Sequence, residues 1–171
     1  ITGILGARAP VFPDVILPMA GVNDLGVNQF PPEVGLAGLD ALIKRLATLR
    51  PAAHMLVSTL TPYIGAVYAH LEANRQTFNA ALPALVASNQ AAGRRVTLCD
   101  VRTRVNWTNA ASMLCSDGVH PNQTGYNEIA QAWFEAMRKL PLVEVWRIGC
   151  FGTSVNSGNA ADSADPDADG S

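Results

Sequence analysis

The sequence is poor in positive charge and has no hydrophobic segment long enough to cross a bilayer. Its 12 Lys and Arg residues are scattered among 14 Asp and Glu residues, so no basic surface for nucleic acid is expected. No apolar run approaches the roughly 20 residues of a transmembrane helix, which argues against membrane insertion. The chain begins Ile1-Thr2-Gly3-Ile4, without the layout of a signal peptide, and this start does not exclude export.

Cysteine is scarce as well. Cys99, Cys115 and Cys150 follow no metal-ligand spacing and are too few for a disulfide-rich scaffold. Buried free thiols are therefore the default expectation. If the protein is exported, a Cys99–Cys115 disulfide is the alternative, and closing a loop of that length would contribute about 3 kcal/mol of stability.

The sequence does contain enough apolar material for one folded domain, since hydrophobic residues make up 49% of its 171 residues. Short apolar runs predict buried strands, at 14–20, 54–60 and 96–101. Amphipathic or alanine-rich patterns predict helices, at about 32–50, 65–92 and 122–140. Because strands alternate with helices, we expect an α/β fold with a parallel sheet covered by helices on both faces.

Two of these helices carry further signals. Pro83 predicts a kink or a break in the second helix, and four polar residues of that helix are expected to face solvent: His70, Glu72, Arg75 and Gln76. In the third helix, either Asn122 or Thr124 is suited to cap the N-terminus. The apolar residues expected on one face of that helix are Tyr126, Ile129, Ala130, Trp133, Phe134 and Met137.

The first candidate for a functional site is Asp117-Gly118-Val119-His120-Pro121, directly before the third helix. Gly118 permits a tight bend, so the Asp117 carboxylate can accept the Nδ1 proton of His120. The Nε2 atom of the ring is then free to take a proton from a nucleophile. Since an Asp-x-x-His spacing also arises by chance, an ordinary capped loop before a helix is the alternative.

The second candidate is Gly21-Val22-Asn23-Asp24, which follows the first apolar run. By itself this stretch is an ordinary turn at the end of a strand. The Asp117 motif follows the third predicted strand through a loop, so both motifs fall at the carboxyl edge of the expected sheet. Ligand sites of open parallel sheets lie at that edge.

Together the two motifs resemble two of the four signature blocks of the SGNH (GDSL) hydrolases, the Gly-x-Asn-Asp block and the Asp-x-x-His-Pro block. The resemblance covers about residues 10–140 and is closest to the carbohydrate acetylesterase branch. It implies a flavodoxin-like, three-layer α/β/α sandwich. It also implies that His120 acts as general base and then acid, that Asp117 orients it, and that Asn23 donates a hydrogen bond to the oxyanion.

The nucleophile of that superfamily has no counterpart here. Its Ser lies in a Gly-Asp-Ser block near the N-terminus, and no Gly-Asp-Ser occurs in this sequence. We therefore expect residues 1–148 to form a partial hydrolase domain that lacks its N-terminal strand and nucleophile and is inactive by itself. The function implied for the whole protein is removal of short acyl groups, acetyl above all, from a polysaccharide, by a secreted enzyme that needs no cofactor.

Two alternatives remain open at this point. One is a non-catalytic domain that binds carbohydrate or a partner on the same fold. The other is a rearranged enzyme whose nucleophile is Ser154, because Val143–Ile148 followed by Gly149–Ser154 faintly imitates a strand, a turn and a serine.

The composition changes at Gly149, after which the chain contains no Lys or Arg. We expect residues 149–171 to be a flexible acidic linker. This segment ends in Asp165-Pro166-Asp167-Ala168-Asp169-Gly170, which matches the first half of a calcium-binding loop. Ca²⁺ is therefore a candidate partner, and a solvated acidic tail is the alternative. This tail also leaves open a third alternative to the hydrolase, a calcium-dependent structural module.

Overall fold

A computed structural model describes residues 13–140 of the chain. Contacts within the chain divide it into two compact units, residues 1–133 and 134–171, and the sheet and the candidate site belong to the first. The predicted linker at 149–171, its candidate calcium loop, Cys150 and Ser154 lie outside the described residues. Of the helices between residues 13 and 140, none is both long and apolar enough to cross a membrane.

The centre of the first unit is a parallel sheet. Its strands are β1 (Val15–Ile16), β2 (His54–Ser58) and β3 (Val96–Cys99), hydrogen-bonded in the order β1-β2-β3. Val15 lies opposite His54, and Met55 lies opposite Val96. The predicted parallel pairing is confirmed, and each strand is shorter than its apolar run. Because the strands are parallel, their carboxyl ends share one edge, where the loops of the candidate site begin.

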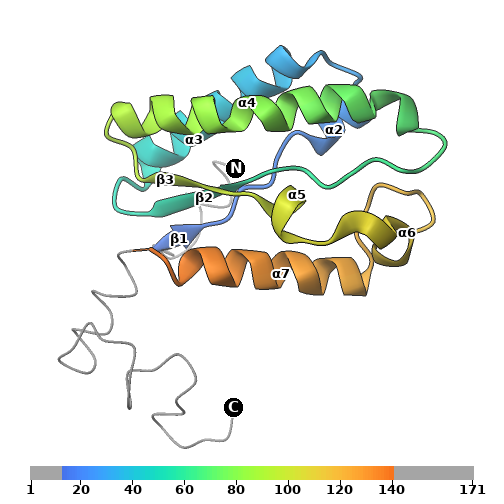
Figure 1. Cartoon of the computed structure of the whole chain (residues 1–171). Helices are drawn as coiled ribbons and strands as arrows, with labels where there is room; N and C mark the ends of the chain where they lie inside the picture. Colours follow the sequence, from blue (N-terminus) through green and yellow to red (C-terminus); the bar gives the residue numbers. More distant parts are fainter. Residues whose placement is uncertain (1–12, 141–171) are drawn as a thin grey trace, which may run out of the picture. The chain divides into compact units, whose positions relative to one another are not determined.

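Two long helices, α3 (Pro32–Leu49) and α4 (Glu72–Ala91), lie side by side on one face of this sheet (Figure 1). Their apolar residues recur every three or four positions, which places them on one helix face. The buried members of that face are Leu39, Ile43, Leu46, Phe78, Leu82 and Val86. They pack with the buried side chains of β2 into one hydrophobic core, so the sheet and both helices are stabilised by the same apolar contacts.

The opposite face is covered by α7 (Gln123–Met137) (Figure 1). Within the first unit, Ile129 and Ala132 of this helix are buried. The Cys99 thiol at the end of β3 donates a hydrogen bond to the Ala132 carbonyl at 3.6 Å. Helices on both faces of a parallel sheet confirm the predicted α/β class. The remaining elements are short: α2 (Val22–Gly26), η1 (Ala69–Leu71), α5 (Val101–Arg104), η2 (Trp107–Asn109) and α6 (Ala110–Met113).

Several details of the helices differ from the predictions. Pro83 does not divide α4, which runs without interruption from Glu72 to Ala91. In α7 the predicted apolar face does not coincide with the buried one, because Tyr126, Ala130 and Phe134 are exposed. Gly125 is buried instead of Tyr126, and a Cβ atom there would meet the Met113 carbonyl. Asn122 is confirmed as the cap of this helix, since its Oδ1 accepts a hydrogen bond from the Gly125 amide at 3.1 Å.

The exposed position predicted for Arg75 is also wrong. Its side chain is only 1% exposed and forms an ion pair with Glu72, one turn earlier in α4. A buried guanidinium requires partners for its charge and its N–H groups. Glu72 and the Leu60 carbonyl supply them, so this arginine belongs to the interior of the fold rather than to its surface.

Substitution of a core residue in α3 should separate burial from helix propensity. Ile43 is completely buried, whereas Val34 in the same helix is exposed. We expect Ile43→Ala to lower the free energy of unfolding by about 2–5 kcal/mol, because it leaves a cavity, and Val34→Ala to change it by no more than about 0.5 kcal/mol. Urea denaturation measures both, and similar values for the two variants would contradict a core built on this face of α3.

Candidate active site

Asp117 and His120 lie together in the loop between α6 and α7. The Oδ2 atom of Asp117 is 2.7 Å from Nδ1 of His120. Its other oxygen, Oδ1, accepts hydrogen bonds from the Val119 amide at 2.8 Å and the His120 amide at 3.0 Å. The carboxylate therefore holds both the backbone and the ring of His120, which is the pairing predicted from the Asp-x-x-His spacing.

These hydrogen bonds also determine the charge of Asp117. Donation from the Val119 amide, then from the His120 amide and ring, lowers the pKa of Asp117 to about 2. Asp117 is therefore ionised at neutral pH and can only accept hydrogen bonds, so the proton of a neutral His120 ring is on Nδ1. The lone pair of Nε2 is then free to accept a proton.

Both side chains are accessible to a substrate. The side chain of His120 is 63% exposed and that of Asp117 is 41% exposed. In the part of the chain that the structure describes, no hydrogen bond is made by Nε2 of His120. A proton acceptor of this kind, fixed on one side and open on the other, is suited to general base catalysis.

The backbone of this loop is held as a narrow hairpin. Leu114 and Pro121 form an antiparallel bridge, and the Cys115 amide donates to the His120 carbonyl at 2.7 Å. Gly118 lies at the bend with a φ of +70°, a left-handed conformation that glycine adopts without strain. The hairpin limits the positions that His120 can take.

A second loop supports the hairpin from outside. The Ile64 and Gly65 amides, which follow β2 in the chain, donate to the Gly118 carbonyl at 2.9 and 3.3 Å. The two backbones approach so closely that a Cβ atom at Gly65 would overlap the Asp117 carbonyl. The contact between the loops therefore requires glycine at position 65, a requirement that no sequence motif signals.

The second loop is in turn fixed to α4. The Asn79 side chain accepts from the Leu60 amide and donates to the Leu60 carbonyl, both at 2.9 Å. Glu72 accepts from the Tyr63 amide at 2.9 Å, and the buried Arg75 holds Glu72 in place. This bracing was not predicted from the sequence, because Arg75 and Glu72 lie at a spacing that is equally typical of an exposed helix face.

Asn23 lies at the same edge of the sheet, in the first turn of α2. Gly21 precedes it with a φ of +119°, which turns the chain sharply after β1. The Asn23 side chain is exposed, and across residues 13–140 it has no hydrogen-bond partner. The Tyr63 hydroxyl donates to the Val22 carbonyl at 3.0 Å, so the loop that supports His120 also contacts the residue next to Asn23. The structure thus joins Asp117 with His120, and Asn23 follows β1 at the same edge of the sheet without a hydrogen bond to either of them.

No described serine is a partner for His120. Ser58, at the end of β2, is buried and its hydroxyl donates to the Thr59 carbonyl at 2.9 Å. Ser112 donates to the Asn109 carbonyl at 2.9 Å. Ser154, the nucleophile of the rearranged alternative, lies outside the described residues.

The cysteines near the site are free thiols. Cys99 is buried and Cys115 is exposed, and no disulfide joins them. Burial raises the pKa of the Cys99 thiol, which suppresses its reactivity. The Cys99–Cys115 bridge considered for an exported protein is therefore wrong, and the expectation of free thiols is confirmed for both residues. Their expected burial is confirmed for Cys99 and is wrong for Cys115.

Known proteins share the sequence pattern of this chain. A family model described as GDSL-like Lipase/Acylhydrolase family matches residues 2–127. The protein named "Putative endoglucanase X" of Acetivibrio thermocellus is 28% identical over 130 residues, which cover 72% of this chain and 49% of that protein. This chain therefore spans about half the length of that relative.

Solved structures share the fold. A carbohydrate esterase family 3 protein from Talaromyces cellulolyticus is 24% identical with a TM-score of 0.63, over 74% of this chain and 58% of that one. A family 3 carbohydrate esterase of Clostridium thermocellum is 25% identical with a TM-score of 0.61, over 78% of this chain and 60% of that one. The residues matched by the family model include all three strands and both candidate motifs.

The ionisation of Asp117 can be measured directly. We expect its carboxyl ¹³C resonance to titrate with a midpoint at a pH of about 2. The folded pKa lies below the unfolded value, so the stability from these hydrogen bonds is complete above about pH 4 and is lost as the pH falls towards 2. In His120→Ala the midpoint should stay below the ordinary value of 3.8, because the Val119 amide is the largest cause. A midpoint at the ordinary value in the unsubstituted chain would contradict the described loop.

Replacement of Gly65 tests the contact between the two loops. Because a Cβ atom there would meet the Asp117 carbonyl, we expect Gly65→Ala to lower the free energy of unfolding by about 1–3 kcal/mol and to shift the amide resonances of Asp117–His120. The control is Gly38→Ala in α3, where a Cβ atom would meet no atom within 4 Å. That change should raise stability by about 0.5–1 kcal/mol. If Gly65→Ala behaves as Gly38→Ala does, the loops do not touch.

Proposed function

Because the chain belongs to the GDSL-like lipase/acylhydrolase family, we propose that it supplies the acid–base pair of a serine ester hydrolase that removes short acyl groups, acetyl in particular, from polysaccharide. The observation that carries this proposal is the 2.7 Å contact between Asp117 and Nδ1 of His120, with Nε2 of the ring open to solvent. Membership of the family supports hydrolase activity in general, and the acyl group and the polysaccharide are part of the proposal.

In the proposed reaction, a serine hydroxyl attacks the carbonyl carbon of the ester while Nε2 of His120 takes its proton. The new C–O bond converts the carbonyl oxygen to an oxyanion, to which the Asn23 amide donates a hydrogen bond in this proposal. The intermediate then expels the sugar alkoxide, which takes the proton from His120. Water, deprotonated by the same histidine, then attacks the acyl carbon; the bond to the serine oxygen breaks, and that oxygen takes the proton back from His120 as the acid leaves. Asp117 orients the ring and stabilises its cationic form throughout.

The proposed reaction needs a nucleophilic serine, and none of the described residues supplies it. The sequence contains no Gly-Asp-Ser, and the chain spans 49% of its curated relative. We therefore place the nucleophile in a part of the protein outside these 171 residues, and we propose that the 171-residue chain alone has no esterase activity.

Two similarities to known proteins support a polysaccharide substrate. The Gly21–Asp24 and Asp117–Pro121 motifs resemble those of carbohydrate acetylesterases. One solved structure with 25% identity is described as a family 3 carbohydrate esterase. A polymeric substrate of this kind lies outside the cell, so we also propose that the protein is secreted.

The test is esterase activity of the full-length protein on 4-nitrophenyl acetate and acetylated xylan. We expect His120→Ala and Asp117→Asn each to lower kcat by a factor of about 10²–10⁴. The matched control is His70→Ala, since His70 is an exposed histidine of the same chain that takes no part in the reaction and should leave kcat unchanged. Loss of activity in His70→Ala but not in His120→Ala would overturn the assignment.

A second measurement separates this proposal from its alternatives. A fluorophosphonate probe should label one serine of the full-length protein and none of the 171-residue chain. Labelling of the chain alone at Ser154 would instead support the rearranged enzyme. Failure to label the full-length protein, together with no hydrolysis of either ester, would support a non-catalytic carbohydrate-binding or partner-binding domain.

A further inference from the structure

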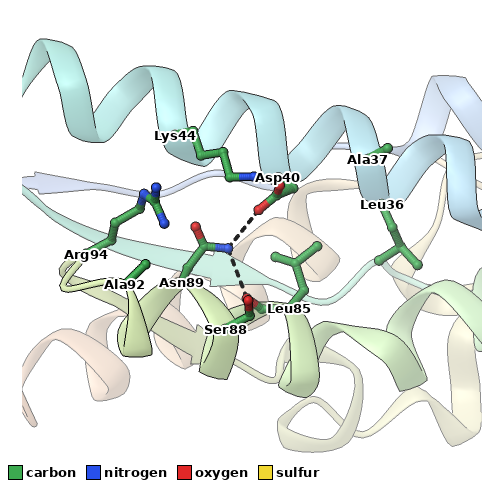
Figure 2. A pocket seen from close by; sticks show the side chains of 9 residues that line it. All are labelled: Leu36, Ala37, Asp40, Lys44, Leu85, Ser88, Asn89, Ala92 and Arg94. Carbon is green, nitrogen blue, oxygen red and sulfur yellow. Dashed lines mark hydrogen bonds and ion pairs between the residues drawn. The ribbon is translucent and has the colours of Figure 1, made fainter.

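A groove of about 550 Å³ lies between α3 and α4, away from the loop that carries His120 (Figure 2). Its walls are partly apolar, formed by Leu36 of α3 and by Leu85 and Ala92 at the end of α4. Its polar side chains are Asp40, Lys44, Asn89 and Arg94. No residue of the candidate active site lines it, so a ligand bound here would be independent of the proposed function.

Asn89 presents an unused hydrogen-bond acceptor to this groove. Its side chain belongs to a residue that is only 2% exposed. Its Nδ2 atom donates to Asp40 Oδ1 and to the Leu85 carbonyl, both at 2.9 Å. Because both partners are acceptors, the amide cannot be turned round, and its oxygen must face the other way. That oxygen is buried without a hydrogen-bond partner in the described part of the chain.

Figure 2 shows the direction of this oxygen. It points away from Asp40, into the space that Lys44 and Arg94 border. A buried acceptor that lacks a donor is unfavourable unless some other molecule supplies one. A hydroxyl or an N–H donor that reached this buried oxygen from the groove would satisfy it.

The charges of the groove define the rest of the ligand. Asp40 forms an ion pair with Lys44. The hydrogen bond from Lys44, and after it the one from Asn89, holds the pKa of Asp40 below its ordinary value. The Arg94 side chain makes no hydrogen bond or ion pair within the described range, and its charge also helps to lower the pKa of Asp40. One negative and two positive side chains leave one positive charge unbalanced, which matches a monoanion better than a dianion.

We propose that this groove binds a hydroxylated monocarboxylate of the size of a sugar ring, such as a uronic acid. The carboxylate pairs with Arg94, whose planar guanidinium suits bidentate contact with a carboxylate. A ring hydroxyl donates to Oδ1 of Asn89, and the C–H face of the ring packs on Leu36 and Leu85. Within the described residues, the Asn89 oxygen is the feature of this groove that lacks a hydrogen-bond partner.

The test is titration of the full-length protein with D-glucuronate at low salt, followed by amide chemical shifts of residues 36–44 and 85–94. D-glucose has the hydroxyls without the carboxylate, and acetate has the carboxylate without the hydroxyls. We expect glucuronate to bind at least about tenfold more tightly than either, because only it engages both Arg94 and Asn89. Equal affinities for glucuronate and acetate, or no shifts in these segments, would overturn the proposal.

Variants locate the site. Arg94→Gln should weaken glucuronate binding about tenfold. Arg95→Gln removes the same charge from the neighbouring exposed residue and should leave the affinity unchanged, as should His120→Ala. Equal weakening by Arg94→Gln and Arg95→Gln would mean that only the general positive charge attracts the anion, which would contradict a built site.

Discussion

The pair of hydrogen bonds from the Ile64 and Gly65 amides to the Gly118 carbonyl is the contact on which the candidate site depends. Asp117 and His120 form their own hydrogen bonds locally, but a hairpin of this length in solvent would adopt many positions. Its contact with the loop after β2 connects it to the sheet. The same loop reaches Val22 through the Tyr63 hydroxyl, so one segment positions both motifs.

The rigidity of that segment comes from the interior of the fold. Arg75 is buried, and a buried charge destabilises a fold unless it is fully paired. Here the guanidinium is paired with Glu72 and with the Leu60 carbonyl, and Glu72 in turn accepts from the Tyr63 amide. The loop after β2 is therefore attached to α4, and the face of α4 that carries Arg75 also contributes Phe78 and Leu82 to the core. A loop site that a packed helix supports is more precisely held than one on a free loop.

The features that could be predicted from the sequence mostly depend on residues close together in the chain. Three apolar runs separated by helical patterns are sufficient for a parallel sheet, and an Asp three residues before a His in a glycine-containing loop is sufficient for their hydrogen bond. The bracing by Arg75 and the close approach at Gly65 could not be predicted, because each depends on segments that meet only in the folded chain. The burial of Gly125 rather than Tyr126 is of the same kind, since it is decided by the neighbouring Met113 carbonyl.

The central claim is that an ionised Asp117 fixes His120 with Nε2 free to accept a proton. The most direct test is the tautomer of His120, read from the ¹⁵N chemical shifts of its ring above the pH at which the ring is protonated. We expect the neutral ring to carry its proton on Nδ1, and Asp117→Asn to reduce this preference. A neutral ring with its proton on Nε2 would contradict the claim, because that atom could then not take a proton from a serine.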